Sequence, residues 1–65
     1  MILKYKNGNN WIFLDNIESV TKIMETELEP SEFISYERKG EMLTQNVSSG
    51  CFLLNDRGQT IERLV

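Results

Sequence analysis

The clearest signal for the fold lies in the last stretch of the chain, Gly50-Cys51-Phe52-Leu53-Leu54-Asn55-Asp56-Arg57-Gly58-Gln59-Thr60-Ile61-Glu62-Arg63-Leu64-Val65. Within it, Asn55-Asp56-Arg57-Gly58 fits a type I turn, because Asn is favoured at the first position and Gly at the fourth. Gly adopts the left-handed conformation easily, so a G1 bulge is expected after the turn. The stretch therefore predicts a β-hairpin over residues 50–65. The expected cross-strand pairs are Asn55 with Gln59, Leu53 with Ile61 and Phe52 with Glu62.

Both faces of this expected hairpin carry apolar side chains. One face holds Cys51, Leu53, Ile61 and Arg63, and the other holds Phe52, Leu54, Thr60, Glu62 and Leu64. A sheet that is apolar on both faces needs cover on both. The rest of the chain is short and many of its residues are polar. We therefore expect a homo-oligomer with part of the sheet at a subunit interface.

Residues 1–14 predict a second hairpin around Asn7-Gly8. Asn-Gly is the strongest short signal for a type I′ turn, whose two central residues both need positive φ. In that register Lys6 pairs with Asn9, Lys4 with Trp11, Leu3 with Ile12 and Ile2 with Phe13. One face then holds Ile2, Lys4, Lys6, Trp11 and Phe13. Lys4 beside Trp11 is expected to form a cation–π pair.

Residues 15–28 admit two interpretations. A helix at about 16–28 would begin with Asp15 as its N-cap and would give an α+β domain. A strand over residues 17–24 would follow a turn at Asp15-Asn16, and its β-branched residues favour this alternative. The strand is preferred because a short Asp-Asn turn after two strands continues an antiparallel meander.

The second half of the chain contains two more strand candidates. A strand is predicted at residues 33–38, followed by a turn at Lys39-Gly40-Glu41 and a short strand at residues 42–46 that pairs back with the first. A polar loop is expected at residues 47–50. The expected fold is mainly β. It consists of two β-hairpins, about 1–14 and 50–65, plus one to three further strands in a small antiparallel sheet or barrel. The 65 residues predict one small domain, 1–65.

Composition argues against catalysis. The chain has no histidine, the commonest general base at neutral pH, and its single cysteine has no histidine partner. One cysteine also excludes an internal disulfide, and with no histidine a structural zinc site is not expected. No phosphate-binding loop or dinucleotide motif is present. We expect a non-enzymatic protein with no metal and no cofactor.

Charge and hydropathy limit the partners. The net charge of −3 argues against a dedicated duplex-DNA binder, although a local basic pocket is compatible with it. No apolar run approaches 18 residues and the N-terminus lacks the layout of a signal peptide, so no membrane partner is expected. A reducing, cytoplasmic setting fits the single cysteine, and would be the host cytoplasm for a phage protein.

Cations and aromatic residues alternate on the expected strands and turns. The candidate ligand-binding residues are Lys4, Lys6, Trp11, Tyr36, Arg38, Lys39 and Arg57. Nucleobases stack on aromatic rings, and phosphates bind guanidinium and ammonium groups. The ordinary alternative is that Trp11 and Tyr36 are core or interface residues and that the cations are solvated strand ends.

The acidic stretch Glu25-Thr26-Glu27-Leu28-Glu29-Pro30-Ser31-Glu32 offers a different kind of site. Its four carboxylates, all of one sign, are typical of a solvated loop, and no calcium-loop spacing is present. The functional alternative is a protein-interaction module that docks a basic surface of a host protein.

The composition, with no alanine and many Asn, Ile and Lys residues, is typical of an AT-rich genome. In size and composition the chain resembles small accessory proteins of phages that infect low-GC hosts. That resemblance implies inhibitors of host proteins or oligomers that sequester nucleotide signals of antiviral defence. We therefore expect a homo-oligomeric anti-defence protein that sequesters a small anionic, nucleotide-like ligand at a subunit interface. The alternatives are the acidic interaction module, or inhibitor, of residues 25–32 and a small structural phage component.

Overall fold

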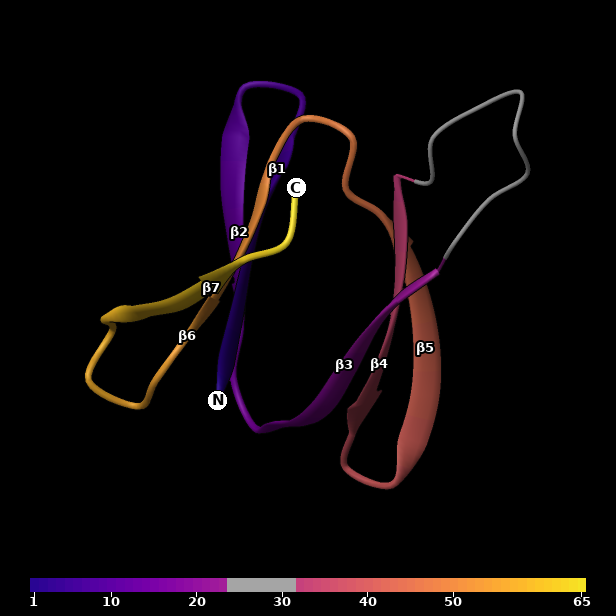
Figure 1. Cartoon of the computed structure of the whole chain (residues 1–65), viewed down its shortest axis with the longest axis vertical. Coiled ribbons are helices and arrows are strands. Elements are labelled where there is room, and N and C mark those ends of the chain that lie inside the picture. The colour runs from indigo at the N-terminus through magenta and orange to yellow at the C-terminus, as the bar shows by residue number, and fades with distance from the viewer. Residues whose placement is uncertain (24–31) are drawn as a thin grey trace.

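The computed structural model describes residues 1–23 and 32–65, which form seven strands (Figure 1). They are β1 (Ile2–Asn7), β2 (Asn10–Leu14), β3 (Ile17–Ile23), β4 (Phe33–Arg38), β5 (Glu41–Asn46), β6 (Cys51–Leu54) and β7 (Thr60–Arg63). No helix occurs in these two ranges. The predicted mainly β fold is confirmed, with a hairpin at each end of the chain and three strands between them.

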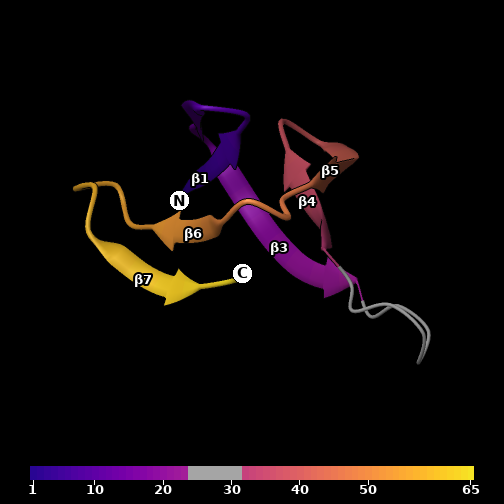
Figure 2. The ribbon, with the colours of Figure 1, turned by 90° about the horizontal axis from the view of Figure 1, so that it is seen from above.

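The strands form two antiparallel sheets instead of one. The first sheet has the order β2-β1-β6-β7 and the second the order β3-β4-β5. They occupy the left and right halves of Figure 1. Seen from above in Figure 2, β4 and β5 lie to the right of β1, β6 and β7, and β3 runs diagonally between the two groups. The predicted meander from β2 into β3 is wrong, because β3 pairs with β4.

The link between the sheets lies at the start of β3. The chain turns at Asn16, whose φ of 56° is in the left-handed region. Directly afterwards, the Ile17 N–H donates to the Met1 carbonyl oxygen at 2.9 Å, and the Met1 amino group donates to the Ile17 carbonyl oxygen at 3.1 Å. The start of β3 is thereby tied to the N-terminus of the first sheet.

The β1–β2 register is two residues away from the predicted one. Lys4 lies opposite Phe13, and Lys6 lies opposite Trp11. The turn explains the difference, since its central residues are Gly8 and Asn9 and only Gly8 has positive φ, at 64°. That pattern is typical of a type II′ turn, so the predicted type I′ turn with Asn7 and Gly8 as central residues is wrong. Because side chains alternate with a period of two, a two-residue shift leaves each side chain on its predicted face.

The turn between β6 and β7 is confirmed. The Gly58 N–H donates to the Asn55 carbonyl oxygen at 3.0 Å, and the Asn55 N–H donates to the Gln59 carbonyl oxygen at 2.8 Å. Gly58 has a φ of 84°, as the expected turn and G1 bulge require.

Beyond that turn the predicted pairs are wrong. Leu53 lies opposite Glu62 and Phe52 lies opposite Arg63, because the register shifts between Leu53 and Leu54. The shift leaves Ile61 as the extra residue of a bulge, with 55% of its surface exposed. The bulge moves Arg63 to the face of Phe52.

β3 confirms the strand interpretation for residues 17–23, so the alternative helix at 16–28 is wrong for this part. Its Val20 lies opposite Tyr36 of β4, where a β-branched side chain suits the pleated surface. Residues 24–31, and with them most of the acidic stretch 25–32, lie outside the described residues. Glu32 is described, and its carbonyl oxygen accepts the Val47 N–H at 2.7 Å.

The predicted β4–β5 hairpin is confirmed, with β5 beginning at Glu41, one residue earlier than expected. Its turn is tight because Lys39 and Gly40 both have positive φ, at 53° and 80°. Positive φ at both central residues is the pattern of a type I′ turn.

The hydrophobic core draws on both sheets. Its buried side chains are Leu3, Tyr5, Cys51 and Leu53 of the first sheet, Ile17, Ile34 and Tyr36 of the second, and Val47 of the intervening loop. Val47, which sequence placed in a polar loop, is fully buried. No helix among the described residues is long and apolar enough to cross a membrane.

Candidate ligand-binding face

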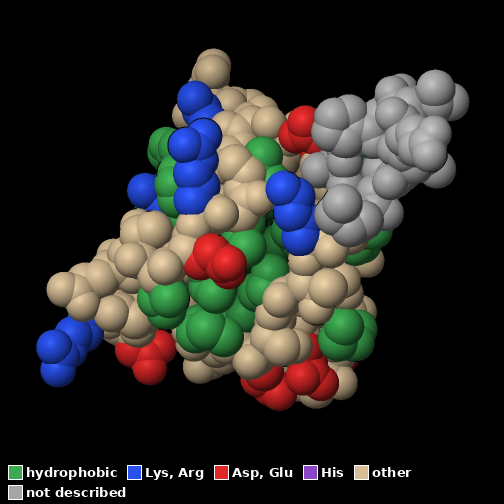
Figure 3. All heavy atoms as spheres, in the orientation of Figure 1, with side chains coloured by type: hydrophobic (Ala, Val, Ile, Leu, Met, Phe, Trp, Pro, Cys, Tyr) green, Lys and Arg blue, Asp and Glu red, His purple; other side chains and the backbone are tan. Residues whose placement is uncertain are grey.

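The outer face of the first sheet, turned away from the core, gathers cationic and aromatic side chains. The registers align Phe13, Lys4, Phe52 and Arg63 in one row across β2, β1, β6 and β7. Trp11 and Lys6 lie opposite each other two residues along, and therefore share this face. We call this set the aromatic–cation face: Lys4, Lys6, Trp11, Phe13, Phe52 and Arg63. Figure 3 shows Lys or Arg side chains beside hydrophobic ones over the β1–β2 hairpin.

Lys4 is at the centre of the face. Its Nζ lies 4.7 Å from the ring centroid of Trp11 and 5.7 Å from the centroids of both Phe13 and Phe52. Each distance is within cation–π range, where an exposed pair contributes about 0.5–1 kcal/mol. The predicted Lys4–Trp11 cation–π pair is confirmed. Three rings thus surround one ammonium group.

Trp11 is supported from β6 and the loop before it. Its ring comes within 3.5 Å of the position that a Cβ on Gly50 would take, and its centroid is 6.1 Å from that of Phe52. Gly50 has a φ of 130°, so a side chain there would be strained as well as crowded against the ring. The ring is nevertheless 42% exposed, and the Nζ of Lys6 lies 5.9 Å from its centroid.

The face has one sign of charge. The row of Phe13, Lys4, Phe52 and Arg63 and the pair of Trp11 and Lys6 contain no carboxylate. Long cationic side chains keep their charged ends near water while their stems cover apolar surface. The arrangement therefore offers flat apolar rings and positive charge together, which suits an anion with an aromatic ring.

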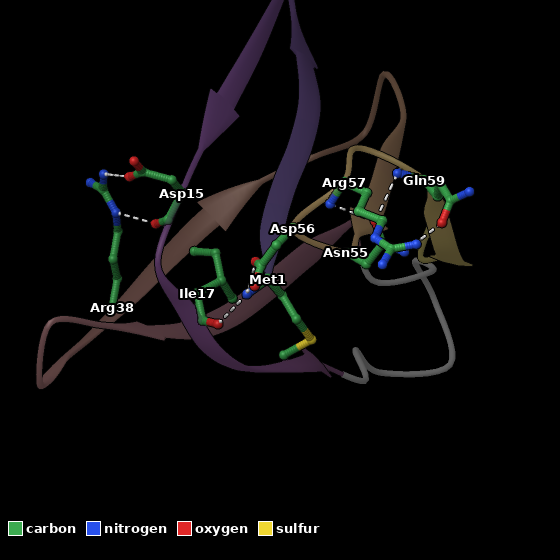
Figure 4. Close-up of polar contacts among 8 residues, drawn as sticks. All are labelled: Met1, Asp15, Ile17, Arg38, Asn55, Asp56, Arg57 and Gln59. Atoms are coloured by element: carbon green, nitrogen blue, oxygen red, sulfur yellow. Dashed lines mark hydrogen bonds and ion pairs between the residues drawn. The ribbon is translucent and has the colours of Figure 1, made fainter.

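Arg38, another predicted ligand-binding residue, is held by Asp15 (Figure 4). Its Nη2 donates to Asp15 Oδ1 at 2.7 Å and its Nε donates to the Asp15 carbonyl oxygen at 2.8 Å. The hydrogen bond from Arg38 lowers the pKa of the Asp15 carboxyl, and the positive charges of Arg38 and Lys39 act in the same direction. Arg38 fastens the end of β4 to the segment between β2 and β3.

The remaining predicted site residues lie elsewhere. Tyr36 is only 7% exposed and belongs to the core, and its hydroxyl-bearing ring is not part of the aromatic–cation face. Lys39 is exposed in the β4–β5 turn. Arg57 is exposed in the β6–β7 turn, where its N–H donates to Asn55 Oδ1 at 2.9 Å (Figure 4). The structure brings together Lys4, Lys6 and Trp11, and places these other residues apart from them.

Sequence reasoning missed Phe13, Phe52 and Arg63 as members of the site. The alternation of the first hairpin already put Phe13 on the face of Lys4 and Lys6. Phe52 joins only because β1 pairs with β6, and Arg63 joins only because of the bulge at Ile61. Neither long-range feature has a signal in the local sequence.

Cys51 lies on the opposite, inner face of the sheet. It is fully buried, and burial raises the pKa of its thiol to about 11. In the described ranges, no three acidic or cysteine side chains come together where they could hold a metal ion.

Comparisons with protein-family models, with curated proteins and with solved structures found no match for this chain.

Proposed function

We propose that this protein is a non-enzymatic binding protein that holds a small anionic, nucleotide-like ligand on the aromatic–cation face. The observation that carries the proposal is the position of Lys4 and Lys6 against the exposed ring of Trp11, on a face whose aligned rows contain no carboxylate. Of the residues expected from sequence, these three form the site.

The chemistry follows from the two kinds of group. A nucleobase stacks on an aromatic ring with about 1–3 kcal/mol per base, and Trp11 and Phe13 both expose ring surface. Ammonium and guanidinium groups bind phosphate oxygens through charge-assisted hydrogen bonds. The cations at hand are Lys4 and Lys6 on β1 and Arg63 on β7. A ligand that carries both a base and a phosphate uses both kinds of group at once.

The proposal extends to the biological setting expected from sequence. The protein acts as a homo-oligomer that sequesters its ligand, as an anti-defence accessory of a phage or mobile element in the host cytoplasm. Oligomerisation is supported by apolar side chains that remain exposed on several strands. Among them, Phe13, Met42 and Ile61 each expose more than half of their surface. The net charge of −3 is compatible with a local cationic site.

The first test uses Trp11, the only tryptophan of the chain, as its own probe. ATP and cyclic di-AMP are titrated into the protein while the Trp11 fluorescence is recorded. We expect saturable quenching by at least one of them, weakened about tenfold or more by Lys4→Ala or Lys6→Ala and by added salt.

The matched controls are Lys39→Ala and Arg57→Ala, which also remove one exposed cation each but lie away from the face. They should leave the affinity unchanged apart from a small long-range charge effect. The site assignment is wrong if the controls weaken binding as much as Lys4→Ala does. The proposed ligand class is wrong if neither nucleotide changes the fluorescence.

A further inference from the structure

The outer edge of the first sheet is formed by β2, whose outward backbone groups have no strand partner among residues 1–23 and 32–65. The Lys6 N–H donates to the Gly50 carbonyl oxygen at 3.0 Å, in the direction of β6. In an antiparallel ladder, hydrogen-bonded and non-hydrogen-bonded pairs alternate. Lys6 and Trp11 are therefore a non-hydrogen-bonded pair, and Trp11 turns its N–H and C=O away from β1. Phe13, two residues along, does the same.

The β2 edge also lacks the features that protect sheet edges from pairing. All five of its residues, Asn10 to Leu14, are uncharged, and none is proline. The other edge strands within the described ranges carry charge: Glu18 and Lys22 on β3, Glu41 on β5, and Glu62 and Arg63 on β7. Register shifts also interrupt β3 and the β6–β7 ladder. Charges and bulges block edge pairing, so β2 is the edge most open to another strand.

We propose that β2 pairs antiparallel with β2 of a second copy of this chain, around a two-fold axis perpendicular to the sheet. A second copy is the favoured occupant because the edge is complementary to itself: it offers matching donors and acceptors, and β2 contributes no charged side chain to the contact. The two four-stranded sheets then form one continuous sheet of eight strands, in the closed two-fold symmetry most common among oligomers.

The register of this pairing follows from the faces. Each face of the joined sheet stays continuous only if residues of the same face lie opposite each other. The register centred on Ile12 meets this condition and pairs all five residues of β2. It sets Trp11 opposite Phe13 of the second copy, and aromatic cross-strand pairs stabilise antiparallel sheets.

The pairing makes the ligand site a composite of two subunits. Each row of the aromatic–cation face now continues across the axis: Arg63, Phe52, Lys4 and Phe13 of one copy, followed by Trp11 and Lys6 of the other. The axis thus concentrates the cations of both copies around exposed rings. This part rests on the proposed function, since a ligand that bridges the copies binds the dimer more tightly than the monomer and shifts the equilibrium toward it.

The test joins native mass spectrometry to cysteine crosslinking. The wild type should give a dimer whose fraction rises with protein concentration and with the nucleotide that quenches Trp11. In the variant Ile12→Cys, the introduced cysteines of the two copies lie directly opposite each other in a non-hydrogen-bonded pair. The Cα atoms of such a pair are about 4.5 Å apart. That spacing suits a disulfide, so mild oxidation should convert the variant into a covalent dimer.

The control is Asn10→Cys, an exposed position on the same strand and face as Ile12. In the proposed register the two Asn10 positions lie four residues apart along the paired strands, about 14 Å, which is too far for a disulfide. Because Ile12 packs against the core and its replacement can weaken folding, hydrogen exchange of the wild type provides a second measurement. The Trp11 and Phe13 amides should become protected as the protein concentration rises.

Each outcome decides the inference. A monomer at all concentrations, with and without nucleotide, overturns the β2 pairing, while saturable quenching of that monomer leaves the proposed function standing. A dimer whose Trp11 and Phe13 amides stay unprotected has its interface elsewhere and also overturns the β2 pairing. The same holds if Asn10→Cys forms the covalent dimer as efficiently as Ile12→Cys does. If the Trp11 and Phe13 amides become protected but no nucleotide quenches Trp11 or raises the dimer fraction, the β2 dimer is supported and the proposed nucleotide-like ligand is wrong.

Discussion

At the scale of single residues, burial decides what Cys51 can do. Its side chain has no exposed surface, and the pKa of its thiol is raised to about 11 by loss of solvation. The nucleophile is the thiolate, which this environment suppresses. Cys51 lies within the apolar run Cys51-Phe52-Leu53-Leu54 of the sequence, and the structure buries its thiol.

The native protein should therefore resist thiol reagents. With a pKa near 11, about one Cys51 in a thousand is ionised at pH 8. We expect dithionitrobenzoate to label almost none of the native protein within minutes and one equivalent in concentrated urea. The exposed thiol of the Asn10→Cys variant is the positive control for labelling. Rapid labelling of the native wild type would show that Cys51 is accessible, contrary to its position in the structure.

At the scale of elements, the turns fix where strands begin and end. Gly58 has a φ of 84°, and Asn55 Oδ1 accepts the N–H groups of both Arg57 and Gln59 at 2.9 and 3.0 Å. These contacts are local in the chain. Because they are local, the sequence predicted this turn correctly. The bulge at Ile61 belongs to the pairing of β6 with β7 beyond the turn, and the sequence missed it.

Gly58→Ala should destabilise the protein by about 1–2 kcal/mol, because an L-residue with a Cβ is strained in the left-handed conformation. Space is not the reason, since a Cβ at this position would have no atom within 4 Å apart from those of Gly58 and its two chain neighbours. The matched variant is Gly58→Asn, which tolerates this conformation and should lose less. Urea denaturation measures both free energies of unfolding. Equal stability of the Ala variant and the wild type would contradict the strained turn.

At the scale of the whole molecule, the two sheets share one small core. Ile34 of the second sheet is fully buried and belongs to the same cluster as Leu3 and Leu53 of the first. A chain of this length buries only about 60% of its unfolded surface, so its stability depends on few side chains. Association of the kind proposed for β2 adds stability that a lone subunit lacks.

Ile34→Ala should lower the free energy of unfolding by about 2–5 kcal/mol, because it removes buried surface and leaves a cavity. Met42→Ala removes a side chain of similar size that is 63% exposed, and should change stability by less than about 0.5 kcal/mol. Thermal and urea unfolding of the two variants provide the comparison. Similar losses in both would contradict a core shared by the sheets at Ile34.

The candidate site was predictable only in part. Alternation along the first hairpin put Lys4, Lys6 and Trp11 on one face, and the two-residue error in register did not change that face. Residues from distant parts of the chain could not be assigned in the same way. Phe52 lies beside Lys4 through a β1–β6 pairing, and Arg38 is bound by Asp15 across a contact between two strand ends.

The sequence by itself determined the strand-rich character, the turns at Gly40 and Gly58, the presence but not the type of a turn at Gly8, and the faces of the first hairpin. These features depend on φ preferences and on alternation over a few neighbouring residues. Only the tertiary structure decided the division into two sheets, the bulge at Ile61 and the meeting of Lys4 with Phe52. The reason is that the choice of strand partner depends on which faces can be buried together, and that depends on the whole chain at once.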